Sequence, residues 1–245
     1  MRLRFLPLAG LLLAAATTHA QQLGQEGAAA QANLNSLTMG APSVTPTATS
    51  EGTIGTPYAI PRWLPAHITL SNNLPLAAVP LKYDVLGHRL LMRPVNRPND
   101  SLVLDDRLVM RFVLDEPASG PYPARQHLYR RFTESPLTTQ RADYVEVLHE
   151  GRYTLLKHPL KNLKKASLNG AYNSGDRHDE IEDKAEYFLR TPEANLVPIK
   201  LGLKPLQNAA PALATALKQA ADAQKPKTEA DWAAVLNAAD PAPAK

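Results

Sequence analysis

Apolar and polar residues alternate with a period of two through the middle of the chain. In the segment 79–85 every odd position is apolar and every even position is polar or proline. This alternation is typical of a half-buried β-strand, whose side chains point to opposite faces in turn. Brief turns such as Leu86-Gly87-His88 separate segments of this kind. Because parallel strands need long crossover connections, which are missing between residues 79 and 201, the pattern predicts antiparallel pairing.

Strands are predicted at residues 79–85, 89–93, 101–104, 108–114, 127–133, 144–148, 153–157, 185–189 and 196–201. The hairpin at residues 149–151 is the clearest, with His149 expected at an exposed tip and Gly151 expected to adopt a positive φ. Pro198 lacks an N–H, so its strand should lie at an edge or turn that position outward. The predicted fold class is mainly β (α+β): an antiparallel meander sheet, or a sandwich or open barrel, with two short C-terminal helices.

The apolar spacing changes to that of helices near the C-terminus. Two stripes mark two short helices: Leu206, Leu213 and Leu217 in the first, and Trp232, Val235 and Leu236 in the second. Thr228 and Asp231 resemble a capping box at the start of the second helix. Since a helix of this length is marginal in water by itself, we expect the tail 205–240 to pack on an antiparallel β-domain spanning 53–204.

The first 20 residues have the features of a secretory signal peptide. Arg2 and Arg4 precede a short apolar run, and Ala20 suits a signal-peptidase site just before Gln21. The apolar run is shorter than the ~20 residues that span a bilayer. Residues 21–52 are rich in Gln, Ala, Ser, Thr and Pro and are predicted to be a disordered leader. We therefore expect an exported mature chain, periplasmic or extracellular, with no transmembrane span.

The composition excludes several kinds of chemistry. The chain has 245 residues, enough for one full-sized domain, and no Cys, which rules out disulfides, thiolate-ligated metals and cysteine nucleophiles. Of 27 Lys and Arg residues, Arg2 and Arg4 would leave with the signal, so 25 basic residues face 23 acidic ones, a net charge of +2. So small a charge predicts no nucleic-acid binding. The basic stretch 157–165 could contact anionic lipid or polysaccharide, although a solvated face is favoured.

Several short motifs follow one another in a recognisable order. They are Gly55-Thr56-Pro57-Tyr58 with Trp63, Leu81-Lys82-Tyr83-Asp84-Val85, Val147-Leu148-His149-Glu150-Gly151, Leu155-Leu156-Lys157 and Glu186-Tyr187-Phe188-Leu189. In this order they resemble an uncharacterised family of secreted or periplasmic β-rich bacterial proteins, over residues 55–240. The resemblance implies an exported β-rich protein and provides no catalytic residues to carry over.

Acidic residues gather between positions 176 and 183. The metal candidates are Asp176, His178, Asp179 and Glu182, because carboxylate oxygens suit calcium and a histidine with a carboxylate could bind zinc. The spacing does not match a calcium-binding loop, and no second histidine lies at helical spacing. A solvated acidic loop explains the same residues, and no cofactor is expected.

Aromatic residues provide the candidate binding surface. Tyr58 and Trp63 could form a stacking platform for sugar rings or a peptide, although packing in the core is the favoured interpretation for this set, which includes Tyr83 and Tyr187. No Gly-x-Ser-x-Gly elbow and no glycine-rich phosphate loop is present in the sequence.

Two functional hypotheses remain from the sequence. The leading one is an exported, non-enzymatic β-rich protein that binds an envelope protein or polysaccharide. The alternative is an exported metal-dependent or hydrolytic enzyme that uses the 176–183 cluster. A pocket joining that cluster to His149 or His127 would favour the enzyme, whereas a grooved, exposed sheet would favour the binding protein.

Overall fold

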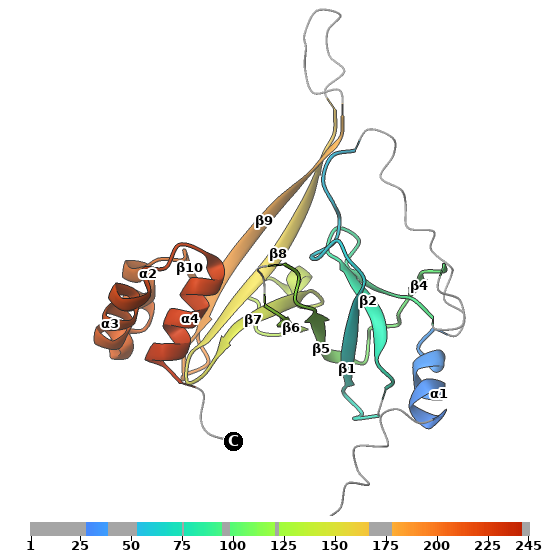
Figure 1. Ribbon diagram of the computed structural model, residues 1–245, viewed down its shortest axis with the longest axis horizontal. Helices are drawn as coiled ribbons and strands as arrows, with labels where there is room; N and C mark the ends of the chain where they lie inside the picture. The colour runs from blue at the N-terminus through green and yellow to red at the C-terminus, as the bar shows by residue number, and fades with distance from the viewer. Residues whose placement is uncertain are drawn as a thin grey trace, which may run out of the picture.

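The computed structural model describes residues 28–38, 53–74, 76–94, 99–120, 123–166 and 178–241. Its strands form one antiparallel sheet (Figure 1). They are β1 (Leu64–Leu70), β2 (Val79–Asp84), β3 (Arg89–Met92), β4 (Leu102–Val103), β5 (Val109–Glu116), β6 (Arg125–Arg131), β7 (Tyr144–Glu150), β8 (Thr154–Lys164), β9 (Glu180–Arg190) and β10 (Leu196–Ile199). The prediction of a mainly β, antiparallel fold with short C-terminal helices is confirmed.

The sheet consists of two meanders joined side by side. The strand order is β10-β9-β8-β7-β6-β5-β1-β2-β3-β4, so that β5 to β10 form one meander and β1 to β4 the other. The junction is the pairing of β1 with β5, where Ala66 lies opposite Leu114 and Ile68 opposite Phe112. Both edges of the sheet are short strands, β10 and β4.

Strand β1 is not among the strands predicted from the sequence. Its alternate residues Leu64, Ala66, Ile68 and Leu70 are buried, which is the same period-two pattern as in the predicted strands. Pro65 takes one of the exposed positions of that pattern, but a proline is also a turn signal in a sequence. In the structure Pro65 lies opposite Pro80, a pair in which neither residue has an N–H to donate.

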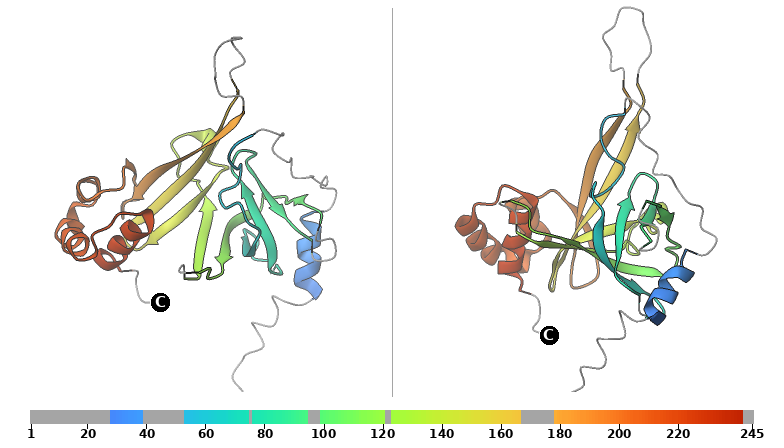
Figure 2. Two further views of the ribbon diagram at one scale, coloured as in Figure 1. Left: turned by 45° about the horizontal axis from the view of Figure 1, so that its top comes forward. Right: turned by 45° about the vertical axis from the view of Figure 1, so that its right-hand side comes forward.

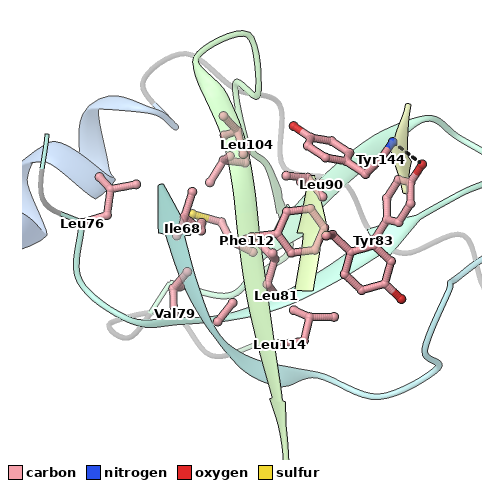
Figure 3. Close-up of a cluster of buried hydrophobic side chains, with 14 of the residues drawn as sticks. Ile68, Leu76, Val79, Leu81, Tyr83, Leu90, Leu104, Phe112, Leu114 and Tyr144 are labelled. Carbon is pink, nitrogen blue, oxygen red and sulfur yellow. Dashed lines mark hydrogen bonds between the residues drawn. The ribbon is translucent and has the colours of Figure 1, made fainter. Parts of the chain in front are cut away.

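The sheet curls around an aromatic core. The rings of Tyr83 on β2 and Tyr144 on β7 lie 5.5 Å apart, although three strands separate β2 from β7 in the sheet. Tyr83 also contacts Phe112 and Tyr129 edge to face, a favoured geometry for aromatic pairs. The Tyr144 backbone N–H donates to the Tyr83 hydroxyl at 3.3 Å, as Figure 3 shows. Tyr83 is therefore a core residue, as the sequence favours.

A segment that precedes β1 connects strands from the two meanders of the curled sheet. The Ile54 N–H donates to the Asp179 carbonyl, and the Ile181 N–H donates to the Ile54 carbonyl, both at 2.8 Å. Three residues later, the Pro57 carbonyl accepts from Val85 at 3.0 Å. This segment thus links the start of β9 to the turn after β2.

A helix lies within the predicted disordered leader. Helix α1 (Ala28–Ser36) buries Ala30 and Leu34, and Leu34 joins the core of the β1–β4 half. The Leu37 carbonyl accepts from Asp105 at 3.0 Å. The structure thus differs from the prediction over residues 28–38, because a two-residue apolar stripe on an Ala-rich segment gives little sequence signal. The signal peptide and the rest of the leader lie outside the described residues.

The C-terminal helices pack on the other end of the sheet (Figures 1 and 2). They are α2 (Leu203–Ala209), the 3-10 helix η3 (Pro211–Leu213), α3 (Ala214–Gln224) and α4 (Glu229–Ala239). Thr228 and Asp231 form the predicted capping box. Val235 and Leu236 are fully buried against the sheet, whereas Trp232 is half-buried. Among the described residues, no helix is long and apolar enough to cross a membrane.

The end of α4 is anchored to the hairpin between β7 and β8. The side chain of Asp240, just after α4, is buried and accepts from the Tyr153 N–H at 2.8 Å. His149 Nδ1 lies 2.5 Å from Asn237 Oδ1, and its side chain is fully buried. The prediction of an exposed His149 is wrong, because a register shift between Val147 and His149 turns this side chain towards α4.

Gly151 is required by close packing and not by its φ. Its backbone is not among the positive-φ residues of the described chain, so that part of the prediction is wrong. A Cβ at Gly151 would lie 2.6 Å from Asp240 Oδ2 and 2.7 Å from the Asp240 carbonyl oxygen. Only a glycine therefore lets α4 end against the hairpin.

We expect Gly151→Ala to destabilise the fold by about 1–3 kcal/mol, because the added methyl group must displace Asp240. Gly202→Ala is the matched control, since a Cβ there would have its nearest neighbour at 3.5 Å. Urea unfolding followed by circular dichroism measures both. Equal midpoints for the two variants would contradict the close approach of Asp240.

Candidate binding groove at the edge of the sheet

An apolar groove of about 550 Å³ lies where β9 and β10 meet the loop before β7. Pro136, Leu137 and Gln140, around the 3-10 helix η2 (Thr138–Gln140), form one wall. Phe188 of β9 and Pro198 of β10 line the other wall. Leu137 is 56% exposed, although it is a large hydrophobic residue. The groove has the concave, mainly apolar character of a binding site.

The local sequence explains why the groove stays open. Strand β10 pairs with β9 only from Tyr187 to Arg190. In the part of β9 before Tyr187, β10 no longer covers the strand. Pro198, opposite Phe188, has no N–H to continue a ladder outward. This confirms the prediction that the Pro198 strand lies at an edge of the sheet.

A chain of polar groups runs from the groove into the sheet. Glu186, at the groove, has its carboxylate 3.7 Å from His158 Nδ1. His158 Nε2 lies 3.0 Å from Asp143, whose other oxygen lies 2.8 Å from His88 Nδ1. Burial raises the pKa of Asp143, but the hydrogen bonds from His158 and His88 outweigh it and lower the pKa. The buried carboxylate therefore stays ionised between two histidines.

The two predicted binding-surface residues lie beside β2 and β3, away from the groove. Lys82 Nζ lies 4.4 Å from the ring centre of Tyr58 and 5.1 Å from that of Trp63. The Arg93 guanidinium lies 4.6 Å from the ring centre of Trp63. Burial lowers the pKa of Lys82, and the nearby charge of Arg93 lowers it further. Both rings, Tyr58 and Trp63, thus contact the same lysine. Each ring already makes a cation–π contact with a side chain of this chain.

The described metal candidates do not form a common metal site. Asp176 lies outside the described residues. Asp179 Oδ1 accepts from the Ala166 N–H at 2.8 Å, and Glu182 forms an ion pair with Lys184 at 2.7 Å. No group of three or more potential metal ligands forms among the described residues, which include His178. A cavity of about 280 Å³ reaches Asp179, but neither His127 nor His149 lines it.

Part of the predicted solvated basic stretch is folded into the sheet, whereas Lys164 and Lys165 are exposed. Lys161 is buried and pairs with Asp183 at 2.8 Å, while His158 is buried behind the groove. Lys157 Nζ lies 2.9 Å from Glu229 of α4. The solvated-face interpretation is therefore wrong for these three residues. Each lies against an acid that is distant in sequence and carries no local signal.

A partly buried polar ladder crosses β5 to β9 and is not predicted from the sequence. Its members are Glu116, His127, Glu146, Lys157, Tyr187 and Glu229. Both nitrogens of His127 are occupied, at 2.9 Å from Glu116 and 2.7 Å from Glu146. Burial lowers the pKa of His127, yet the hydrogen bonds to Glu146 and Glu116 outweigh it and raise the pKa. A histidine bound on both sides is suited to holding strands together, not to exchanging protons with a substrate.

Comparison of the chain with models of protein families, with curated proteins and with solved structures gave no match. The geometry of the groove and of the sheet edge beside it is therefore the basis for inferring a function.

We expect the stability contributed by His127 to be present at acidic pH and lost at alkaline pH. Since its folded pKa is raised, the contribution is complete below about pH 6.5, the unfolded value, and falls as the pH rises through the folded value. The unfolding free energy should therefore fall more between about pH 6 and about pH 9 in the wild type than in His127→Gln.

Urea unfolding at several pH values measures this difference. His67→Gln serves as the control for replacing a histidine, because the His67 side chain is 60% exposed. The same pH dependence in the wild type and in His127→Gln would show that His127 does not gain a proton on folding.

Proposed function

We propose that the chain is an exported, non-enzymatic protein that binds a partner in the cell envelope or outside the cell through the groove between η2 and the β9–β10 edge. The observation that carries this proposal is the exposed Leu137 on the wall of an open, apolar groove. An exposed apolar patch of this kind commonly marks a binding surface. Export is supported by the signal-like residues 1–20.

Two further features support binding rather than chemistry at this site. The groove is lined mainly by prolines, aliphatic residues and the ring of Phe188. Its charged residues are Glu186 and Lys200, and the described structure places neither beside a hydroxyl nucleophile with a histidine base. The enzyme alternative gains no support from the 176–183 segment, where Asp179 and Glu182 already make structural contacts.

Groove binding is tested with Leu137→Glu, which places a charge on the apolar wall. We expect a partner retained from an envelope extract by the immobilised wild type to be bound about tenfold more weakly by this variant. Leu108→Glu is the matched control, since Leu108 is also exposed but does not line the groove. Envelope components that bind all three proteins equally, as measured by quantitative mass spectrometry, would refute groove binding.

Export is tested separately by N-terminal sequencing of the protein from the native organism. The mature chain should begin at Gln21 and be recovered outside the cytoplasm, because the residues before it have the pattern of a cleaved signal. A mature chain that retains Arg2 and Arg4 would contradict this part of the proposal.

A further inference from the structure

The outer edge of β9 is covered at both ends and open in the middle. At its start, Ile54 pairs with the strand, and the Ile181 N–H donates to the Ile54 carbonyl at 2.8 Å. At its end, β10 pairs with residues 187–190. Between these contacts, residues 182–186 pair with β8 on one side, and no described strand pairs with them on the other.

The direction of the backbone groups in this open stretch follows from strand geometry. In an antiparallel strand the N–H and C=O of alternate residues point to the same edge. Since Ile181 donates outward to Ile54, the odd-numbered residues Asp183 and Ala185 also point outward.

Two prolines give independent evidence for the same direction. Pro159 on β8 lies opposite Ala185 and has no N–H, so this pair cannot exchange hydrogen bonds and Ala185 must face outward. Pro198 on β10 lies opposite Phe188, so that pair is also not hydrogen-bonded, and the neighbouring Tyr187 faces β10. Asp183 and Ala185 together offer two N–H and two C=O groups at this open stretch.

The open stretch adjoins the groove, because Ala185 and Glu186 line it. The acids here differ in their pairing. Asp183 is paired with Lys161 and Glu182 with Lys184, at 2.8 and 2.7 Å. Glu186 is half-exposed, and its carboxylate lies 3.7 Å from His158 Nδ1. A basic side chain would therefore complement Glu186, and an apolar one would fit beside Leu137.

A second copy of this chain fits the stretch poorly. When two copies pair as antiparallel strands about a two-fold axis, residues that lie opposite each other have their side chains on the same face of the sheet. If both Asp183 and Ala185 take part, Asp183 of one copy lies opposite Ala185 of the other, and the axis passes at Lys184. Lys184 would then lie opposite Lys184, and Glu182 opposite Glu186. Like charges directly opposite each other are destabilising.

We propose that an extended segment of another protein adds as a strand to β9 at Asp183–Ala185, with an apolar side chain in the groove and a basic side chain against Glu186. This mode of recognition uses main-chain hydrogen bonds for attachment and side-chain pockets for specificity. It rests on the proposed function, because it names the chemical class of the partner that the groove binds.

The test is a selection of displayed random peptides of about ten residues against the immobilised full chain. Ala185→Pro removes the outward N–H while leaving the β8–β9 ladder intact, since the Ala185–Pro159 pair is not hydrogen-bonded. Ala185→Val is the matched control, because it adds a branched side chain and keeps the N–H. Circular dichroism and the unfolding midpoint establish that both variants are folded.

We expect the selected peptides to carry an apolar and a basic residue, and to lose at least about tenfold in affinity for Ala185→Pro but not for Ala185→Val. Hydrogen exchange of the wild type gives a readout that needs no variant. The amides of Asp183 and Ala185 should slow when a selected peptide binds, whereas the amide of Lys184, which points to β8, is protected beforehand.

Three results would overturn strand addition: no enriched peptide, equal affinity for the wild type and Ala185→Pro, or unchanged exchange at Asp183 and Ala185. Peptides that bind Ala185→Pro normally but fail to bind Leu137→Glu would retain the groove as a binding site and reject only the strand pairing. Peptides insensitive to both variants would contradict both proposals.

Discussion

The pairing of β1 with β5 is the contact on which the rest of the architecture depends. Each meander forms from hairpins that are close in sequence, but β1 and β5 are separated by β2, β3 and β4. Their pairing joins the meanders into one sheet, and the twist of that sheet brings Tyr83 against Tyr144. The contact of Ile54 with β9 and of Pro57 with Val85 is a second link between the two meanders. A non-local pairing of this kind is costly in chain entropy, which the shared aromatic core must offset.

The inner face of the sheet carries two apolar clusters with the partly buried polar ladder between them. Strand alternation places Tyr144 and Glu146 on this face, and Lys157 and Leu155 beside them. Ion pairs that are buried in part contribute little net stability, but they penalise any register that leaves a buried partner such as Glu146 alone. Glu229 extends the ladder to α4 through Lys157 and fixes the helices on this face. The groove, lined by Phe188 of the opposite face, is left uncovered by them.

Local patterns in the sequence predict the strands and helices of this fold, but they predict few of the tertiary contacts between them. The period-two strands, the Thr228 capping box and the edge position of Pro198 depend on neighbouring residues and are found in the structure. The burial of His149, the pairing of β1 with β5 and the polar ladder depend on partners distant in sequence, which no local pattern encodes. Of the candidate site, the sequence predicts only Pro198 at an edge. The groove itself requires η2 to lie beside β9.

The register of this sheet limits what its open edge can do. Pro159 and Pro198 lie opposite Ala185 and Phe188 in pairs that are not hydrogen-bonded, and in this register Asp183 and Ala185 are the residues that face outward between Ile54 and β10. A long, flat edge would bind almost any extended chain, including a copy of itself. Two outward residues allow at most a few main-chain hydrogen bonds, each worth only about 1 kcal/mol net in water. Selective binding at such an edge must therefore come from side chains, and the groove beside Ala185 is where this fold provides room for one.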